Sequence, residues 1–465
     1  MDYVSLGSTD DIGASCHLLM VEGTGLMLDA GVHPDVDGPE GLPRLGLIQS
    51  RPELWVDHVL VSHAHHDHLG ALPVVLQRFP HALVHFTKPT RLLAEFLLRA
   101  SARLQRRRLR EGSSTADPLF DEDELTYHEY LYLPHDLNQP FNVTGVRGTS
   151  PIQATFYHAG HVLGAAGTLL TFEEAGQKRR VFYTGDVHLR PQVVTPAADL
   201  PGGPVDVLIM EATLGADASQ EAVMRREEER RFAEALDAVI RRGGVALVPV
   251  FALGRSHEML ALIDRFKKRR MIDPDTPVYT AGSMRALAEI YDDTRLISPR
   301  LDADLTYAAI DQPRLPRSET ALLNILREPG IVLVPSGMMF ERTASNDLAQ
   351  YLVDQEKHAV FLVGYAKPGS PAHRLHEAAL QGEGTMVTLD PETGEQPVFC
   401  TVDRFRFSGH SHRKDLLTLV DRLRPKTVIL VHGEPAAKAW MAEAIRAAHP
   451  DTTVVLPEIG VPVTV

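Results

Sequence analysis

Five of the six residues that follow Ser62 can bind a metal ion, and the run reads His63-Ala64-His65-His66-Asp67-His68. The apolar stretch before it, from Val56 to Val61, predicts a buried strand that ends at this point. On a turn that leaves a strand, His63 and His65 can point to one position in space. Asp67 and His68 would open a following helix and can point to a second position. Imidazole together with one carboxylate suits Zn²⁺ or a similar ion, so the stretch predicts a metal site at a strand end.

The helix after this run can be predicted from its own residues. Ser62 and Asp67 are both of a type that caps helices, so we expect one of them to cap this one. Its apolar face would consist of Leu69, Leu72, Val75 and Leu76. The alternative is a His-rich surface loop that binds metal adventitiously. The agreement of strand, turn and helix favours a built site.

Two metal ions need more ligands than this stretch supplies. His161, Asp186 and His432 each follow an apolar run and lie beside a glycine, where the backbone can approach a ligand closely. A single residue of this kind is more often structural, but three in order after the first run favour metal binding. Asp29, at the end of a strand-like run, is either a turn residue or a carboxylate that orients a metal ligand.

The composition narrows the class of protein. The chain has 465 residues, enough for two domains or for one domain with a large insert, and 44% of them are hydrophobic. No apolar run reaches the length of a membrane span, and the first residues carry no basic region, so we expect neither membrane insertion nor a secretory signal. Cys16 and Cys400 lie far apart without a metal-binding spacing. They suit a reducing cytosol and predict a cytoplasmic protein whose thiols are buried and inert.

The charge of the chain limits how it could bind nucleic acid. There are 61 acidic and 47 basic residues, a formal net charge of −14. This argues against general coating of nucleic acid, but it is compatible with a local basic cleft or with a metal centre that supplies positive charge. The predicted helix 90–111 has a basic end, for which we favour a solvated helix face over a nucleic-acid patch. The arginines of this basic end are Arg99, Arg103, Arg106, Arg107, Arg108 and Arg110.

The pattern of the chain changes near residue 215. From there, strand-like runs such as Val245 to Val250 and Gly330 to Val334 alternate with helical segments. This alternation predicts α/β units on a parallel sheet. The polar stretch Asp390 to Gln396 predicts a boundary loop.

Several motifs carry a resemblance to a known family. The first run resembles the H-x-H-x-D-H signature of the metallo-β-lactamase superfamily, whose members hydrolyse lactams, thioesters, lactones and phosphodiesters. Other segments resemble successive motifs of the β-CASP nucleases, which include ribonuclease J, bacterial and archaeal homologues, and the endonuclease subunit of the pre-mRNA 3′-processing complex. In chain order these segments are Gly160-His161-Val162-Leu163-Gly164-Ala165, Tyr183-Thr184-Gly185-Asp186, Glu211 to Gly215, Phe251-Ala252-Leu253-Gly254-Arg255, Ser336-Gly337-Met338, Val363-Gly364-Tyr365, Ser408-Gly409-His410 and Val431-His432-Gly433-Glu434.

The resemblance implies a fold and its boundaries. The expected fold is α/β, an αββα metallo-β-lactamase sandwich with an inserted α/β β-CASP domain. We expect residues 1–211 to form the first part of the sandwich, 212–395 the β-CASP insert and 396–465 the last part of the sandwich.

The resemblance also implies roles for the candidate residues. Two zinc ions per chain are expected, the first bound by His63, His65 and His161, the second by Asp67, His68 and His432, with Asp186 bridging. His410 matches the histidine that contacts the scissile phosphate and protonates the leaving group. Glu211 and Asp29 match carboxylates that orient the site. The expected substrate contacts are Arg255, Ser336, Gly337, Lys367, Ser408 and His410, with Arg342 and Arg374 as basic residues that are either cleft or surface charges.

The implied function is hydrolysis of phosphodiester bonds in single-stranded RNA, with a metal-bridging hydroxide as nucleophile and His410 as general acid. RNA-acting members carry a histidine at the position of His432, which favours RNA over DNA. The chain departs from the family at Ala212 and Leu214, where Ser and Tyr are usual, and after Met338, where Met339-Phe340-Glu341-Arg342 replaces a glycine-rich run. The second departure concerns the substrate contacts and not the metal ligands. The alternatives are a DNA-directed nuclease, a hydrolase of small esters or thioesters, and a non-catalytic RNA-processing scaffold. Endonuclease or 5′-exonuclease action, and the oligomeric state including a homodimer, stay open.

Overall fold

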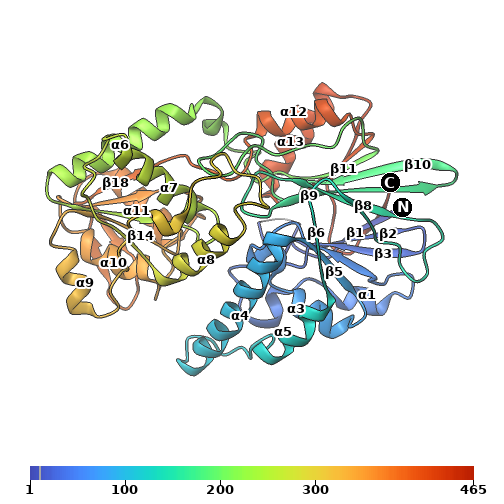
Figure 1. Cartoon of the computed structure of the whole chain (residues 1–465), viewed down its shortest axis with the longest axis horizontal. Coiled ribbons are helices and arrows are strands. Elements are labelled where there is room, and N and C mark those ends of the chain that lie inside the picture. Colours follow the sequence, from blue (N-terminus) through green and yellow to red (C-terminus); the bar gives the residue numbers. More distant parts are fainter. Residues whose placement is uncertain (10–11) are drawn as a thin grey trace. The chain divides into compact units, whose positions relative to one another are not determined.

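The computed structural model in Figure 1 describes residues 1–9 and 12–465. The chain divides into two compact units. Unit 1 comprises residues 1–190, 197–221 and 410–465, and unit 2 comprises 191–196 and 222–409. The sequence analysis places the boundaries after residues 211 and 395, whereas the units divide after 221 and 409. One reason is that β18 (Thr401–Arg404) pairs with β15 (Ala359–Leu362) in the sheet of unit 2.

Unit 1 contains two seven-stranded sheets. The first has the order β21 (Pro462–Thr464), β1 (Asp2–Ser5), β2 (His17–Val21), β3 (Thr24–Leu28), β4 (His58–Leu60), β5 (Leu83–Thr87) and β6 (Tyr132–His135). The second has the order β20 (Thr453–Val455), β19 (Thr427–Val431), β11 (Val207–Glu211), β10 (Gln177–Tyr183), β9 (Ala166–Glu174), β8 (Gln153–His158) and β7 (Pro140–Asn142).

The side chains of β11 show how these sheets form layers. Val207 and Ile209 belong to a buried cluster that also contains Leu26 and Leu60 of the first sheet, so this cluster lies between the two sheets. Leu208 and Met210, which point to the opposite face because side chains alternate along a strand, pack with residues of α12 (Arg413–Leu423) and α13 (Pro435–Ala448).

Helices cover the other face of the first sheet, as Figure 1 shows for unit 1. They are α1 (Gly46–Ser50), α3 (Leu72–Arg78), α4 (Lys88–Arg110) and α5 (Glu122–His128), with short 3₁₀ turns at Gly38–Gly41 and Glu129–Leu131. The layers of unit 1 are therefore helix, sheet, sheet and helix, which confirms the predicted αββα sandwich.

Unit 2 is built on a five-stranded sheet whose paired strands are all parallel, in the order β13 (Val278–Thr280), β14 (Gly330–Val334), β12 (Val245–Pro249), β15 and β18. Residues of α10 (Ala344–Leu352) and α11 (Pro371–Gln381) share a buried cluster with the sheet. Phe232 of α6 (Arg225–Arg241) contacts Phe361 of β15 and Phe266 of α7 (Arg255–Lys268). Such an arrangement suits a parallel sheet, whose strands are apolar on both sides.

The remaining elements of unit 2 are not strands of this sheet. They are α8 (Gly282–Asp293), a 3₁₀ turn at Tyr307–Ala309, α9 (Glu319–Ile325) and a hairpin of β16 (Met386–Thr388) and β17 (Glu395–Pro397). A further 3₁₀ turn at Ala218–Ala222 spans the boundary between the units. The α/β organisation predicted for this section is confirmed.

The basic end of α4 is largely neutralised by local acidic residues. Arg99 pairs with Glu129 at 2.5 Å, Arg103 with Glu122 at 2.8 Å and Arg108 with Asp37 at 2.9 Å. These pairs support the interpretation of this end as a solvated helix face. Both cysteines are buried and unpaired, as predicted, and burial raises the pKa of the Cys400 thiol to about 12. Among the described residues, no helix is long and apolar enough to cross a membrane.

Candidate metal centre

The histidine run lies at the end of β4, as the sequence predicts. Gly70 and Ala71 separate α2 (His66–Leu69) from α3, so the predicted single helix is two short helices. The predicted cap is wrong, because the N-cap of α2 is His65 and it makes no side-chain capping bond. Ser62 instead donates from its hydroxyl to Asp29 at 2.7 Å. Ser62 therefore binds the carboxylate of Asp29 and does not cap α2.

Four of the predicted ligands form the first group. His65 Nδ1 lies 3.0 Å from His63 Nε2 and 3.2 Å from His161 Nε2. Asp186 Oδ2 lies 3.6 Å from His63 Nε2 and 3.5 Å from His161 Nε2. Four donors at about 2.1 Å from one tetrahedral ion would lie about 3.4 Å from each other. The spacing of these four atoms fits a single zinc-sized cation.

The other three predicted ligands form a second group beside the first. Asp67 Oδ2 lies 3.3 Å from His432 Nε2 and 3.8 Å from His68 Nε2. The second oxygen of Asp186, Oδ1, lies 3.4 Å from His68 Nε2 and 3.3 Å from His432 Nδ1. One carboxylate thus faces the first group with one oxygen and the second group with the other, which is the arrangement a bridging ligand requires.

Two atoms at the centre of these groups are buried without a hydrogen-bond partner among the described residues. They are His68 Nε2 and Asp186 Oδ1. A buried polar atom left in this state is costly, and a metal ion between the two would satisfy both. The donor set of histidines and carboxylates also matches the ligands that zinc uses. The residues present therefore fit a metal centre.

Sharp backbone turns bring these side chains to one place. Asp29 and His432, each directly after a strand, have left-handed φ angles of +59° and +46°. Gly185, before Asp186, has φ +53°, and a Cβ atom there would lie 2.6 Å from Ser62 Cβ. Only glycine allows this close approach without a shift, as the sequence analysis expects for glycines beside the ligands.

Asp29 fixes the orientation of His68. Its carboxylate is fully buried, accepts from the Ser62 amide at 2.6 Å and from the Tyr183 hydroxyl at 2.6 Å, and lies 2.7 Å from His68 Nδ1. With Nδ1 held in this way, Nε2 of His68 points toward Asp186. This is the carboxylate–histidine arrangement that orients metal ligands in proteins.

Glu211 holds His410 in the same manner. Its Oε2 lies 2.9 Å from His410 Nδ1, and its Oε1 accepts from the Val187 amide at 2.6 Å. The other ring nitrogen of His410, Nε2, lies 3.9 Å from Asp186 Oδ2. Burial lowers the pKa of His410, but Glu211 and Asp186 outweigh burial and raise it to about 9. His410 therefore presents a proton-bearing nitrogen beside the two ligand groups.

The pKa values of the candidate ligands depend on their burial and on the charges of the neighbouring candidate ligands. Burial opposes the charge on Asp186, yet His432, His68 and His410 hold the pKa of this carboxylate well below its usual range. Burial, followed by the neighbouring His68, lowers the pKa of His63 well below its usual range. A deprotonated carboxylate and a neutral imidazole are the forms that bind a metal ion.

Apart from His410, the residues predicted to contact substrate belong to unit 2, whereas the candidate ligands and His410 belong to unit 1. Arg255 is 7% exposed at the start of α7, and its Nη2 donates to Gln192 Oε1 at 3.0 Å. Ser336 is held by Ser345, whose hydroxyl donates to its carbonyl at 2.8 Å. Gly337 lies against Phe251, with 3.2 Å between the position of a Cβ and that ring.

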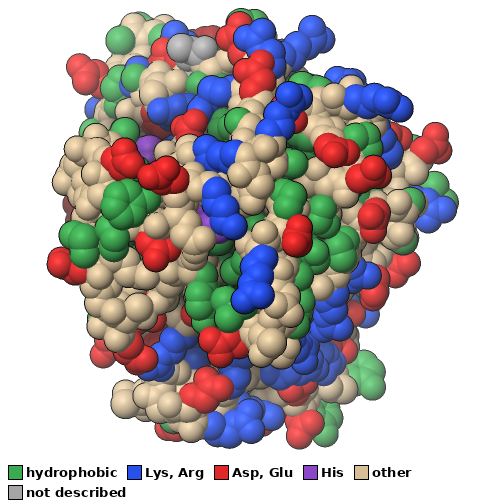
Figure 2. All heavy atoms as spheres, turned by 90° about the vertical axis from the view of Figure 1, so that its left-hand side faces the viewer, with side chains coloured by type: hydrophobic (Ala, Val, Ile, Leu, Met, Phe, Trp, Pro, Cys, Tyr) green, Lys and Arg blue, Asp and Glu red, His purple; other side chains and the backbone are tan. Residues whose placement is uncertain are grey.

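The other predicted residues of unit 2 lie in loops or make local ion pairs. Lys367 lies between β15 and α11, and Ser408 lies after β18. Arg342 pairs with Glu392 at 2.8 Å, and Arg374 donates to the carbonyl oxygen of Thr388 at 3.0 Å. These contacts favour surface roles for the last two arginines. On the face shown in Figure 2, basic side chains are spread over the surface with acidic ones among them.

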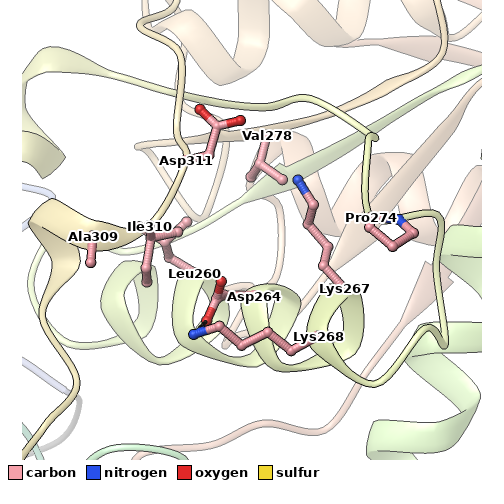
Figure 3. Close-up of a pocket in the computed structure, with 9 residues that line it drawn as sticks. All are labelled: Leu260, Asp264, Lys267, Lys268, Pro274, Val278, Ala309, Ile310 and Asp311. Carbon is pink, nitrogen blue, oxygen red and sulfur yellow. Dashed lines mark ion pairs between the residues drawn. The ribbon is translucent and has the colours of Figure 1, made fainter.

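A pocket on unit 2 contains none of the predicted site residues. It is lined by Leu260, Asp264, Lys267, Lys268, Pro274, Val278, Ala309, Ile310 and Asp311, as Figure 3 shows. Its two lysines are engaged locally, because Lys268 pairs with Asp264 at 2.7 Å and Lys267 donates to the Thr276 carbonyl at 2.8 Å.

Two residues that support the predicted ligands, Tyr183 and Thr213, were given no role from the sequence. Tyr183 donates to Asp29, and the hydroxyl of Thr213 lies 3.0 Å from His432 Nδ1 and also bonds Glu211. Both residues lie in motifs that also contain predicted site residues, and this position was the signal that could have identified them as supporting residues.

Comparison with known proteins identifies the family. A metallo-beta-lactamase superfamily model matches residues 9–232, a Beta-Casp domain model matches 256–375, and a model described as a Zn-dependent metallo-hydrolase RNA specificity domain matches 395–457. The chain belongs to the β-CASP family of the metallo-β-lactamase superfamily. This confirms the resemblance found in the motifs.

Curated relatives of this β-CASP protein match nearly its whole length. Endoribonuclease YSH1 of Candida glabrata is 28% identical over 453 residues, which cover 95% of this chain and 56% of that protein. Cleavage and polyadenylation specificity factor 73 of Drosophila melanogaster is 29% identical over 435 residues, or 92% of this chain and 59% of that protein. The chain therefore spans little more than half the length of these relatives.

One solved structure shares the fold over the full length of both chains. It is a protein of unknown function from Enterococcus faecalis V583, with a TM-score of 0.55 and 17% sequence identity. At this identity the likeness concerns the fold alone.

Proposed function

We propose that this β-CASP protein is a zinc-dependent ribonuclease that hydrolyses phosphodiester bonds of single-stranded RNA. The observation that carries the proposal is the position of Asp186, whose two oxygens face two separate groups of ligands while His410 lies alongside. The relatives named above are called an endoribonuclease and a cleavage factor, and the match of residues 395–457 to an RNA specificity model supports RNA as substrate.

The proposed ligand set has seven members. His63, His65 and His161 would hold one zinc ion, Asp67, His68 and His432 the other, and Asp186 would bridge them. Two bound ions would supply a nucleophilic water at neutral pH and would polarise the oxygens of the phosphate. Asp29 keeps His68 in the correct ring orientation for this role through its 2.7 Å contact.

His410 is proposed as the general acid. Its Nδ1 is held by Glu211, which leaves Nε2 directed toward the ligand groups. A proton on Nε2 could pass to the oxygen that leaves when the phosphodiester breaks. Glu211 acts through His410, because it fixes the ring and favours its protonated form.

Substrate contacts are proposed for the residues of unit 2 that match family motifs. They are Arg255, Ser336, Gly337, Lys367 and Ser408. The two unpaired cysteines are compatible with a cytoplasmic location, where thiols stay reduced.

We predict about two zinc ions per chain. Seven ligand side chains in two adjoining groups suffice for two sites that share one carboxylate. Elemental analysis of purified, active protein measures the ratio directly. A ratio of one or less in an active preparation would contradict the paired site.

Single-stranded RNA should be cleaved much faster than DNA of the same sequence. The expectation comes from His432, which stands where RNA-acting relatives of this family carry a histidine, and from the match to an RNA specificity model. The measurement is kcat/KM on matched RNA and DNA strands, with a generic thioester as a third substrate. Binding should weaken as salt rises, since counterions leave the strand when basic groups bind it.

The same assay decides between the alternatives. Equal rates on RNA and DNA would remove the argument from His432. Efficient thioester hydrolysis without nuclease activity would show a small-ester hydrolase on the same metal centre. No hydrolysis of any substrate by zinc-loaded protein would favour a non-catalytic scaffold.

A further inference from the structure

Residues 191–196, which we call the strap, are a short segment of unit 2 whose two ends continue into unit 1. They belong to unit 2, while residues 190 and 197 on either side belong to unit 1. The loop closes in unit 1, where the Ala198 amide donates to the His188 carbonyl at 2.9 Å. The chain therefore crosses between the units twice at the strap, in addition to the crossings after residues 221 and 409.

One buried carboxylate holds the strap in unit 2. Glu258 of α7 is 3% exposed. Its Oε2 accepts from the amides of Val193 at 2.6 Å and Val194 at 3.0 Å. Its Oε1 accepts from the Thr195 amide at 3.0 Å and from the Thr195 hydroxyl at 2.7 Å. Three consecutive backbone amides of the strap thus depend on a single side chain.

Other contacts of unit 2 converge on the same segment. Arg255, one helical turn before Glu258, donates from Nη2 to Gln192 Oε1 at 3.0 Å. The Leu301 amide donates to the Val194 carbonyl at 2.9 Å. Four of these six bonds end on the carboxylate of Glu258.

The strap follows shortly after the proposed bridging ligand in the chain. Asp186 lies five residues before its first residue, Pro191. The residues between are fixed in unit 1, since the Leu189 amide donates to the Ser411 hydroxyl at 2.9 Å and Arg190 pairs with Asp415 at 2.7 Å. Ser411 follows His410 in the chain. Freeing the strap would therefore leave Asp186 and His410 held by their own contacts.

From these contacts we infer that Glu258 is a positioning residue for RNA cleavage: it fastens the strap and so joins unit 2 to the loop that carries Asp186. The inference rests on the proposed function. A short phosphodiester reacts within the ligand groups of unit 1. An RNA strand also needs the contacts of unit 2, so only its cleavage depends on this fastening.

The test compares Glu258→Gln with the unsubstituted protein. Glutamine keeps the size of the side chain, but its amide nitrogen cannot accept from the strap. Cleavage of single-stranded RNA should fall by about tenfold to 10²-fold, the scale of loss from a small misplacement far from the chemistry. Hydrolysis of bis(p-nitrophenyl) phosphate and the zinc content should not change. Hydrogen exchange within residues 193–195 should become faster, because the amides that face the glutamine nitrogen lose their acceptor and the others keep only an uncharged one.

Glu228→Gln is the matched control. Glu228 is also a buried carboxylate of unit 2, 8% exposed, but it accepts from the Arg406 amide at 2.6 Å and makes no described contact with the strap. The Glu228→Gln variant therefore measures the general effect of losing a buried carboxylate in unit 2. Thr195→Val, which removes only the hydroxyl bond to Glu258, should shift exchange and RNA cleavage in the same direction by less. It tests the inference if Glu258→Gln does not fold.

Unchanged exchange at residues 193–195, or unchanged RNA cleavage, in Glu258→Gln would overturn the inference. So would an equal fall on RNA and on the small diester, because Glu258 would then act through the metal centre. If the unsubstituted protein cleaves no RNA, the proposed function fails and the role in cleavage with it. The exchange comparison would still decide separately whether Glu258 holds the strap.

Discussion

Asp186→Ala should remove nearly all hydrolytic activity while leaving most of the fold in place. This carboxylate faces both ligand groups, with its oxygens 3.4 Å from His68 and 3.5 Å from His161. Metal ions contribute several kcal/mol to such reactions, so we expect a loss of about 10³-fold or more in kcat. The measurements are RNA cleavage, zinc content and circular dichroism of the variant.

Asp57→Ala is a matched control for this variant. Asp57 is another buried carboxylate of unit 1, which accepts from the Gly25 amide at 2.9 Å and from Trp55 Nε1 at 2.9 Å. Its loss should lower stability without a specific loss of zinc or of activity per folded molecule. Cleavage by Asp186→Ala at the parental rate would show that the ligand assignment is wrong.

His410→Ala should keep both zinc ions and lose about 10²–10⁴-fold in turnover, the range for removal of a general acid. The ring lies outside the two ligand groups that contain Asp67 and His63, yet its Nε2 is 3.9 Å from Asp186 and its Nδ1 is held by Glu211. Elemental analysis and single-turnover cleavage of RNA measure the two properties separately.

Two further variants serve as comparisons for His410→Ala: Glu211→Gln, which removes the carboxylate partner of His410, and His449→Ala, which replaces a surface histidine. Glu211→Gln should lower turnover by a smaller factor, since the histidine remains but is less well oriented. His449 is on the surface and pairs with Asp421 at 2.8 Å, so its replacement should change neither property. Loss of bound zinc in His410→Ala would instead identify His410 as a ligand, because its ring also groups with Asp186 and Glu211.

The gathering of the proposed ligands in two groups could be predicted from the sequence because each residue has a local signal. His63, His65, Asp67 and His68 follow one strand at fixed spacings, and His161, Asp186 and His432 lie beside glycines. These residues come from separate strand ends, and a β-sandwich brings such ends together at one edge. The layers were expected from the family resemblance, and the structure agrees, since alternate residues of β11 face different clusters.

Contacts between distant segments could not be predicted in this way. Ser62 is a typical capping residue, but its hydroxyl donates to the buried carboxylate of Asp29 instead of capping the helix. In the sequence, Glu258 looks like any other charged residue of an amphipathic helix. Nothing in the sequence of the strap indicates that the amides of residues 193–195 need an acceptor from elsewhere in the chain. Arg255 stands in a family motif, yet its burial and its bond to Gln192 depend on where the chain places residue 192.

The most direct test of the central claim is cleavage of end-labelled single-stranded RNA by purified protein with and without a metal chelator. We expect cleavage that stops when the chelator removes zinc, returns when zinc is added back, and stays absent from Asp186→Ala under every condition. Cleavage that continues at the same rate in chelated protein, verified metal-free by elemental analysis, would contradict this claim.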